Sequence, residues 1–235
     1  DINKISSKVK QIITLLRLYK VVSVRHIMYD MLSDSMTSPF GGSMRVSSYE
    51  KEKSLEKLFI RKDDVKNLKK FFKIMLPRIP KNFYESRDTS VTPTLISFRR
   101  YCDSLFENGL IERRIANAVM GLECIYLGSE ENQELNFRLK MRIAKVFSLL
   151  GYDGSKIKNY IKDAYRIRSI FVHGGHLSNE DKEKYGKIYG DIKNLLSFIL
   201  EYLRISIIIL ILTHIEKEDF ITLIDDSFID NSKKI

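Results

Sequence analysis

Hydrophobic residues recur every three or four positions through most of this chain, and few residues interrupt the pattern. The stretch after Thr92-Pro93 is typical, with Leu95, Phe98, Cys102 and Leu105 on one helical face. Only 4 prolines and 11 glycines occur in 235 residues. Such spacing indicates amphipathic α-helices, and no segment alternates with the period of two that a strand requires. We therefore predict an all-α fold.

The same periodicity indicates where the helices lie and where the chain divides. Hydrophobic residues make up 44% of the chain and charged residues 30%, which favours a packed core over disorder. An irregular connection at 77–91, containing Pro77 and Pro80, separates a helical N-terminal region, 1–90, from a helical domain, 91–235. Between 33 and 48 the composition indicates a long loop. We expect helices at about 4–32, 51–59, 63–76, 92–107, 111–127, 132–150, from Ser155 to about 173, from Ser178 through Leu203, and 216–230.

Positive charge is concentrated in the first part of the chain. The net charge is +10, and residues 1–100 hold 21 Lys and Arg against 10 Asp and Glu. One helical face there is compactly basic, with Lys66, Lys69, Lys70 and Lys73. These lysines either contact the phosphates of a nucleic acid or form a solvated surface, and the charge alone does not decide between the two.

Two cysteines and one apolar run indicate the cellular compartment in which the protein is expected. Cys102 and Cys124 lie in separate helical patterns without a CxxC pair, which argues against a disulfide framework or a zinc site and fits a reducing cytoplasm. The apolar run from Ile205 to Leu212 is shorter than the roughly 20 residues that span a bilayer, so we expect a buried core helix and no membrane. Because the chain begins at Asp1, an upstream segment or domain is expected.

The stretch from Asp163 to Gly175 contains the strongest candidates for chemistry. Arg168 falls on the apolar face of its helix, where an unpaired charge is costly. Glu123, at the edge of another apolar stripe, is the partner we expect for it. The pair is either part of a site or only a structural link between two helices. Arg166 and Arg168 precede His173 by seven and five positions, a spacing that chance alone often produces.

His173 lies near the end of that helix, before two glycines that favour a left-handed turn. An imidazole beside a fixed guanidinium suits RNA cleavage, because the imidazole transfers a proton while the guanidinium holds the phosphate. His173 is equally well explained as a residue that caps the helix. His176 is either a second proton-transfer group or a loop residue. The chain has no HExxH, P-loop, GxSxG or GxGxxG motif.

Three segments taken together resemble the HEPN superfamily, and within it the Apea-like HEPN domains. They are GLECIYLGSEEN at 121–132, RLKMRIAKVFSLLG at 138–151 and AYRIRSIFVHGG at 164–175. The resemblance covers about residues 92–205. The matching positions are Leu122, Glu123, the run from Ala144 to Gly151, Tyr165, Arg168, Ser169, His173 and Gly174.

The resemblance implies a helical bundle that forms a homodimer and cleaves RNA without a metal or cofactor. The 2′-hydroxyl would attack the phosphate and leave a 2′,3′-cyclic phosphate and a 5′-hydroxyl. Arg168 would bind the phosphate, His173 would be the acid and base, and Tyr165, Ser169, Glu123, Arg166 and His176 would support them. Ser169 stands where many relatives carry a more strongly polar residue. Such proteins act in prokaryotic anti-phage defence or as toxins. Other members are non-catalytic modules that bind RNA or a partner protein within a larger assembly.

Overall fold

A computed structural model describes residues 2–21, 61–85, 91–106 and 109–230, and it shows an all-α protein. In the described ranges the elements are α1 (Ile2–Tyr19), α2 (Lys62–Met75), the 3₁₀ helix η1 (Lys81–Phe83), α3 (Pro93–Phe106), α4 (Ile111–Tyr126), α5 (Leu135–Leu149), α6 (Gly154–Val172), α7 (Asn179–Tyr189), α8 (Ile192–Thr213) and α9 (Lys217–Ile229). The helices expected at 4–32 and 51–59 and the loop at 33–48 fall wholly or partly outside the described residues.

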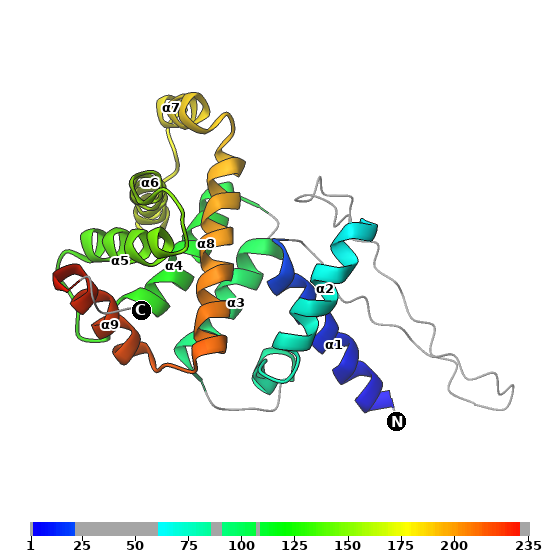
Figure 1. The fold of residues 1–235 in the computed structure, drawn as a ribbon. Helices are drawn as coiled ribbons and strands as arrows, with labels where there is room; N and C mark the ends of the chain where they lie inside the picture. The colour runs from blue at the N-terminus through cyan, green and yellow to red at the C-terminus, as the bar shows by residue number, and fades with distance from the viewer. Residues whose placement is uncertain (1, 22–60, 86–90, 107–108, 231–235) are drawn as a thin grey trace, which may run out of the picture.

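The helices form a bundle around α4 and α8. Helix α3 packs along α4, and α4 also contacts α6 and α8. Figure 1 shows α8 running through the middle, with α5 and α6 on one side and α1 and α2 on the other. Helix α9 folds back against α5. The arrangement buries the apolar stripes that the sequence shows, because each amphipathic helix turns its stripe toward the centre.

One hydrophobic core extends from the first helix to the last. Its fully buried side chains include Leu122 of α4, Phe147 of α5 and Leu203 of α8. Leu15 and Leu18 of α1 are also completely buried and belong to the same cluster. The division of the chain at residues 90 and 91 stays a prediction. Within the structure, α1 contributes to the core that the later helices share.

Polar contacts also hold the C-terminal end of α1 on the bundle. Arg204 of α8 donates from Nη1 to the backbone carbonyls of Leu18 at 2.5 Å and Tyr19 at 3.1 Å. These carbonyls have no partner within α1, and an arginine is a suitable cap for them. The hydroxyl of Tyr101 on α3 donates to the carbonyl of Arg17 at 2.8 Å. The end of α1 is therefore bound to both α3 and α8.

The expected helix positions agree closely with the structure where helices have clear ends. Thr92 caps α3 as expected, since its hydroxyl accepts from the backbone N–H of Leu95 at 3.2 Å. The expected cap of α6 was wrong by two residues. The Asp153 carboxylate accepts from the backbone N–H of Ser155 at 3.0 Å, so Ser155 lies inside the helix. Asp and Ser are both good caps, and the first of the two is used here.

The long helix expected after Ser178 is two helices, and this prediction was wrong. Gly190 adopts φ +76° at the end of α7, and Asp191 caps α8 by accepting from the backbone N–H of Lys193 at 2.8 Å. A glycine that ends a helix, followed by an aspartate that starts one, marks such a break. The apolar periodicity continues across the break, which is why it suggested one helix.

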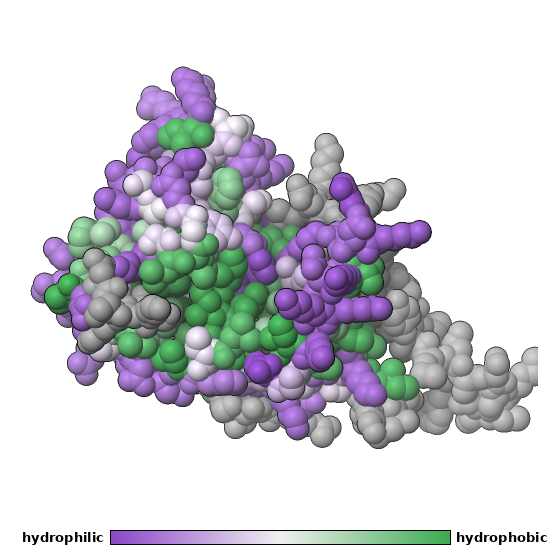
Figure 2. Space-filling view, viewed as in Figure 1, coloured by the Kyte–Doolittle hydropathy of each residue, from purple (hydrophilic) through white to green (hydrophobic). Residues whose placement is uncertain are grey.

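Helix α8 is the one described helix that is long and apolar enough to cross a bilayer by length and composition. Its most apolar window has a mean hydropathy of 2.3, and 56% of that window is buried inside the bundle. Figure 2 shows a hydrophobic area on the visible face over the C-terminal half of α8, where Ile205, Ile208 and Ile209 are half-buried. Burial of this kind is typical of the core helix of a bundle.

A buried arginine of α5 links that helix to α9 and to the end of α4. Arg142 of α5 has only 2% of its surface exposed. Its guanidinium donates to the Glu131 carboxylate at 2.7 and 2.8 Å and to the Asp225 carboxylate at 2.6 and 2.8 Å. It also donates to the carbonyl of Tyr126 at 2.7 Å. The network joins α5 to α9 and to the end of α4.

Candidate functional site

Helix α6 carries the predicted site residues, and its C-terminal end has a defined geometry. Val172 is the last residue of the helix, His173 is its C-cap, and Gly174 follows with φ +78°. The backbone N–H of Gly175 donates to the carbonyl of Ile170 at 2.9 Å, and that of Gly174 donates to the carbonyl of Phe171 at 3.0 Å. These two bonds form a Schellman motif, which needs a left-handed residue that glycine supplies without strain. The expected glycine turn after His173 is confirmed.

Arg168 has the partner that the sequence predicted. Its Nη2 atom lies 3.1 Å from Oε2 of Glu123, and the contact joins α6 to α4. The two side chains are 25% and 15% exposed, so the pair is largely but not fully desolvated. The Arg168 guanidinium also lies 5.7 Å from the centroid of the Tyr165 ring, one turn earlier on α6. The guanidinium is therefore held between a carboxylate and an aromatic ring.

Most of the Arg168 hydrogen-bonding capacity is unused. The Glu123 contact is its one hydrogen bond among the described residues, and the buried Nε atom has no partner there. A guanidinium has five N–H donors, and a buried donor without an acceptor is unfavourable. Arg168 therefore keeps donors that an anion with several oxygens, such as a phosphate, would satisfy.

Burial changes the acid–base behaviour of the groups around Arg168. Desolvation raises the pKa of the Glu123 carboxyl, and the Arg168 guanidinium opposes this by lowering it. Desolvation also raises the pKa of the Tyr165 hydroxyl, helped by the negative charge of Glu123 and opposed by Arg168. A carboxyl with a raised pKa becomes protonated at a higher pH than a solvated one, and it then no longer forms an ion pair.

His173 and Arg168 do not meet within one chain. The His173 side chain is exposed at the end of α6, whereas that of Arg168 is directed toward α4. Five residues separate them, so their directions around the helix differ by about 140°. No hydrogen bond between them occurs in the described part of the chain. His176 is also exposed, in the connection between α6 and α7.

A cavity of about 410 Å³ brings together three of the predicted supporting residues. Tyr165, Arg166 and Ser169 line it from α6, and Asn136 of α5 and Lys184 of α7 line its other sides. Arg166 is engaged elsewhere, because its Nη2 atom forms an ion pair with Asp181 at 3.0 Å. That ion pair connects α6 to the first turn of α7. Arg168 differs from Arg166 in that its Nε atom is buried without a partner among the described residues.

Sequence reasoning did not identify the other residues of this cavity. Lys162 also lines it, and the Oδ1 atom of Asn136 is buried without a partner in the described part of the structure. A helix brings residues three and four positions apart onto one side, so Lys162 lies one turn before Arg166 and Ser169 lies one turn before His173. That spacing is the signal that would have found Lys162. Asn136 and Lys184 come from other helices, and no local pattern marks them.

The basic face of α2 lies away from α6. Lys66, Lys69, Lys70 and Lys73 are all exposed along one side of α2. Figure 1 places α2 on the opposite side of α8 from α5 and α6, and Figure 2 shows hydrophilic side chains projecting over α2. The structure does not bring these lysines beside Arg168 or His173 within one chain.

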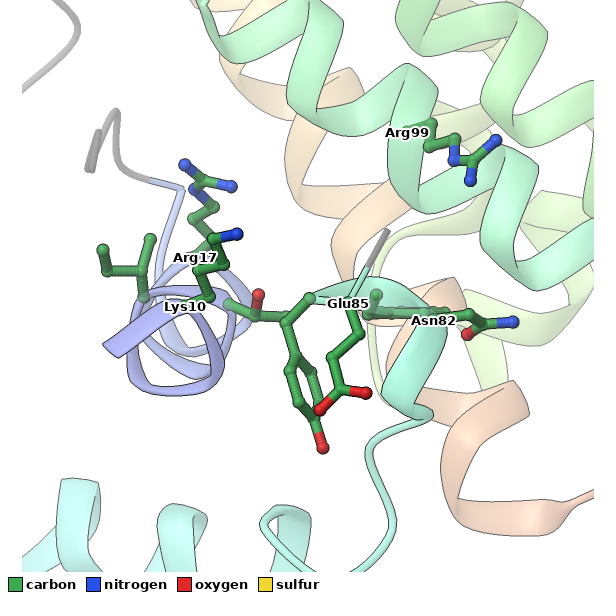
Figure 3. Close-up of a pocket in the computed structure, with 9 residues that line it drawn as sticks. Lys10, Arg17, Asn82, Glu85 and Arg99 are labelled. Carbon is green, nitrogen blue, oxygen red and sulfur yellow. The ribbon is translucent and has the colours of Figure 1, made fainter. Parts of the chain in front are cut away.

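A second cavity, of about 330 Å³, lies between α1, η1 and α3. Figure 3 shows Lys10 and Arg17 reaching it from α1, Arg99 from α3, and Glu85 from the chain after η1. Its charges are partly satisfied, since the Arg17 guanidinium lies 4.4 Å from the Phe106 ring centroid and Glu85 accepts from Ser7 at 2.9 Å. This cavity contains none of the predicted site residues.

The described residues hold no group of three or more His, Cys, Asp or Glu side chains that could together bind a metal ion. Comparison of the chain with protein-family models, with curated proteins and with solved structures found no match. We therefore infer function from the chemistry of α6 and its surroundings.

Proposed function

We propose that this protein is a metal-independent endoribonuclease of the HEPN type, active as a homodimer. The observation that carries the proposal is that Arg168 is held in place but has few hydrogen-bond partners. Its guanidinium is held by Glu123 and Tyr165, yet keeps a buried, unpartnered Nε and other unused donors. An exposed histidine follows at the end of the same helix. The order of the segments at 121–132, 138–151 and 164–175 supports the same family.

The proposed reaction needs only an imidazole and a guanidinium. His173 takes the proton of the ribose 2′-hydroxyl, or gives a proton to the departing 5′-oxygen. The 2′-oxygen forms a bond to phosphorus as the bond to the 5′-oxygen breaks. Arg168 holds the phosphate oxygens and stabilises the charge that develops on them. The products are a 2′,3′-cyclic phosphate and a 5′-hydroxyl, and no other reactant is consumed.

The divergence of Arg168 and His173 around α6 supports a site that two chains share. Positions five residues apart on an α-helix differ in direction by about 140°, which favours a site in which the arginine and the histidine come from different chains. A two-fold axis near the end of α6 would place His173 of one protomer beside the Arg168 of the other. Symmetric dimers of this kind are the most common oligomers.

RNA cleavage in the presence of EDTA tests the proposal. Wild-type protein is expected to release products with a 2′,3′-cyclic phosphate, and His173→Ala and Arg168→Ala are expected to release none. His214→Ala and Arg78→Ala are the matched controls, because they remove the same residue types from exposed positions outside α6 and its cavity. Activity that survives both His173→Ala and Arg168→Ala, or that requires a metal, would contradict the proposal.

A second candidate function is a non-catalytic module that binds RNA or a partner protein. The observation that favours it is the exposed lysine face of α2, formed by Lys66, Lys69, Lys70 and Lys73 and distant from α6. Replacing these four lysines with glutamine separates the two functions. If the module is a binding protein, this variant loses RNA binding while wild-type protein binds without cleaving.

The cellular setting is part of the same proposal. We place the protein in the cytoplasm of a prokaryote, unanchored to a membrane, in a defence or toxin system with RNA as its target. An upstream domain or a partner protein would then control it. Cys102 and Cys124 are free cysteines, which suits a reducing compartment. Expression in a bacterial host, with growth and RNA integrity compared between wild type and His173→Ala, tests this placement.

A further inference from the structure

The cavity beside α6 has the charge and the shape of a site for one unit of a nucleic acid strand. Its volume of about 410 Å³ falls within the range of about 300–1,000 Å³ typical of small-ligand pockets. Its lining includes three cationic side chains, those of Lys162, Arg166 and Lys184, against the carboxylate of Asp163.

Two of these charged groups are already partnered, which shows where an anion would bind. Asp163 accepts a hydrogen bond from the Tyr189 hydroxyl at 2.7 Å, and Arg166 is paired with Asp181. Lys162 is exposed and forms no ion pair in the described ranges, and the Lys184 ammonium lies over the Tyr185 ring at 5.9 Å from its centroid. The two ammonium groups are therefore the cations available to a phosphate.

One residue of the cavity wall, Asn136, has a buried neutral acceptor. The Oδ1 atom of Asn136 is buried and has no partner among the described residues. A buried acceptor left unpaired is unfavourable, so a donor that reaches it would stabilise the folded protein. Phosphate oxygens cannot donate. A ligand that combines an anion with an N–H or O–H group, as a nucleotide does, would suit both the ammonium groups and this acceptor.

The position of the cavity on α6 adds a third requirement. Tyr165 lines it and contacts Arg168, and Ser169 lines it one turn before His173. A ligand in the cavity therefore lies next to the candidate reaction centre. The ring of Tyr165 also offers an aromatic surface, on which bases of single-stranded RNA stack.

We propose that this cavity is a subsite for the nucleotide beside the scissile phosphate, with Lys162 and Lys184 binding its phosphate and Asn136 Oδ1 accepting from its base. The inference rests on the proposed function, because it takes RNA as the ligand. It adds a substrate-positioning role for three residues outside the Arg–His pair. Recognition of this kind gives sequence preference through the base and salt-dependent affinity through the phosphate.

Binding of a labelled RNA that cannot be cleaved tests the subsite separately from catalysis. The probe is a fluorescein-labelled 12-nucleotide RNA with every 2′-hydroxyl methylated, and its affinity is measured by anisotropy at several salt concentrations. Wild-type protein is compared with Lys162→Ala/Lys184→Ala and Asn136→Ala. Lys187→Ala, one turn beyond Lys184 on α7 and outside the cavity lining, is the charge control.

The double lysine variant is expected to bind about tenfold more weakly and to reduce the slope of log affinity against log salt by about one. Asn136→Ala is expected to bind about fivefold more weakly with an unchanged slope, because it removes a neutral acceptor. Lys187→Ala is expected to change neither quantity. Circular dichroism checks the fold of each variant, and the exposed lysines carry the test even where Asn136→Ala is unstable.

Equal losses in Lys187→Ala and the double variant would overturn the subsite, because they would show diffuse surface charge. Wild-type affinity in folded Asn136→Ala would overturn it too. The cleavage assay distinguishes this failure from failure of the proposed function. If wild-type protein cleaves RNA while the cavity variants bind normally, only the subsite is wrong. If the probe binds through the cavity and nothing is cleaved, only the nuclease proposal is wrong.

Discussion

Arg168 and Glu123 join α6 to α4 through a single contact, with Nη2 and Oε2 separated by 3.1 Å. Both side chains are largely buried, so removing one leaves the other charge without a partner. We expect Glu123→Ala to lower the free energy of unfolding by about 1–3 kcal/mol. In a double-mutant cycle with Arg168→Met, the coupling energy is expected to be about 1 kcal/mol. Urea unfolding monitored by circular dichroism measures all four proteins. Strictly additive effects would show that the contact contributes nothing.

Arg142 is buried and pairs with two carboxylates, those of Glu131 and Asp225. Replacing it with methionine removes the buried cation that Glu131 and Asp225 share. We expect Arg142→Met to lower the free energy of unfolding by about 3–5 kcal/mol. Arg138 also pairs with Glu131, but its side chain is 43% exposed. Arg138→Met is therefore the control, with an expected loss below about 1 kcal/mol. Similar losses in both variants would contradict the assignment.

Glu131 makes the stability of the protein depend on pH. Hydrogen bonds from Arg142 lower its pKa to about 2 from an ordinary value of 4.5. A lowered pKa means that the folded state favours the ionised carboxylate, so this stabilisation is present above pH 4.5 and is lost as the pH falls toward 2. The stability difference between wild type and Glu131→Gln should therefore shrink with acidification. Urea unfolding from neutral pH to the acid range measures it, with the exposed Glu130→Gln as control. A constant difference would refute the linkage.

Gly174 and Gly186 respond to alanine in opposite directions. Gly174 has φ +78°, where an alanine side chain is strained, so Gly174→Ala is expected to cost about 1–2 kcal/mol. Gly186 lies inside α7, and an added Cβ would meet nothing within 4 Å. Gly186→Ala is expected to stabilise the protein by about 0.5–1 kcal/mol, because alanine loses less backbone entropy in a helix. Thermal unfolding measures both. A Gly174→Ala variant as stable as wild type would show that the left-handed conformation of Gly174 is not required.

A shared site predicts that two inactive proteins complement each other. A mixed dimer of Arg168→Ala and His173→Ala still holds one arginine and one histidine on opposite chains. We expect no RNA cleavage from either variant alone and partial activity after the two are co-expressed. Both variants keep His176, so any difference in activity comes from residues 168 and 173. Mixed dimers that stay inactive would show that each chain needs its own Arg168 and His173.

Local sequence signals predicted the helices and the end of α6 because the determinants are local. Thr92 before Pro93 and the two glycines after His173 act within one turn of the chain. The partner of Arg168 was also predictable, because an arginine on an apolar face requires an anion and Glu123 was a carboxylate beside such a face. The same reasoning, applied to Arg142 between Leu139 and Ile143, would have located the second buried network.

Other features depend on which helices pack together, and local sequence patterns do not indicate that. Asn136, Lys162 and Lys184 line one cavity only because α5, α6 and α7 come together. No periodicity distinguishes these residues from other solvated ones. The break at Gly190 had a local signal in the glycine and the aspartate that follows. The apolar pattern on either side of it masked that signal.

The exposed side chain of His173 affects how a lineage of such proteins can diverge. Its backbone is fixed by the glycine turn, while its imidazole makes no contact that the core needs. One nucleotide change in the gene can therefore remove the imidazole and leave the bundle intact, and a reversion can restore it. Substitution of Arg142 or Arg168 disturbs a buried charge at the same time. Among related proteins, we therefore expect the histidine to be lost more often than either arginine.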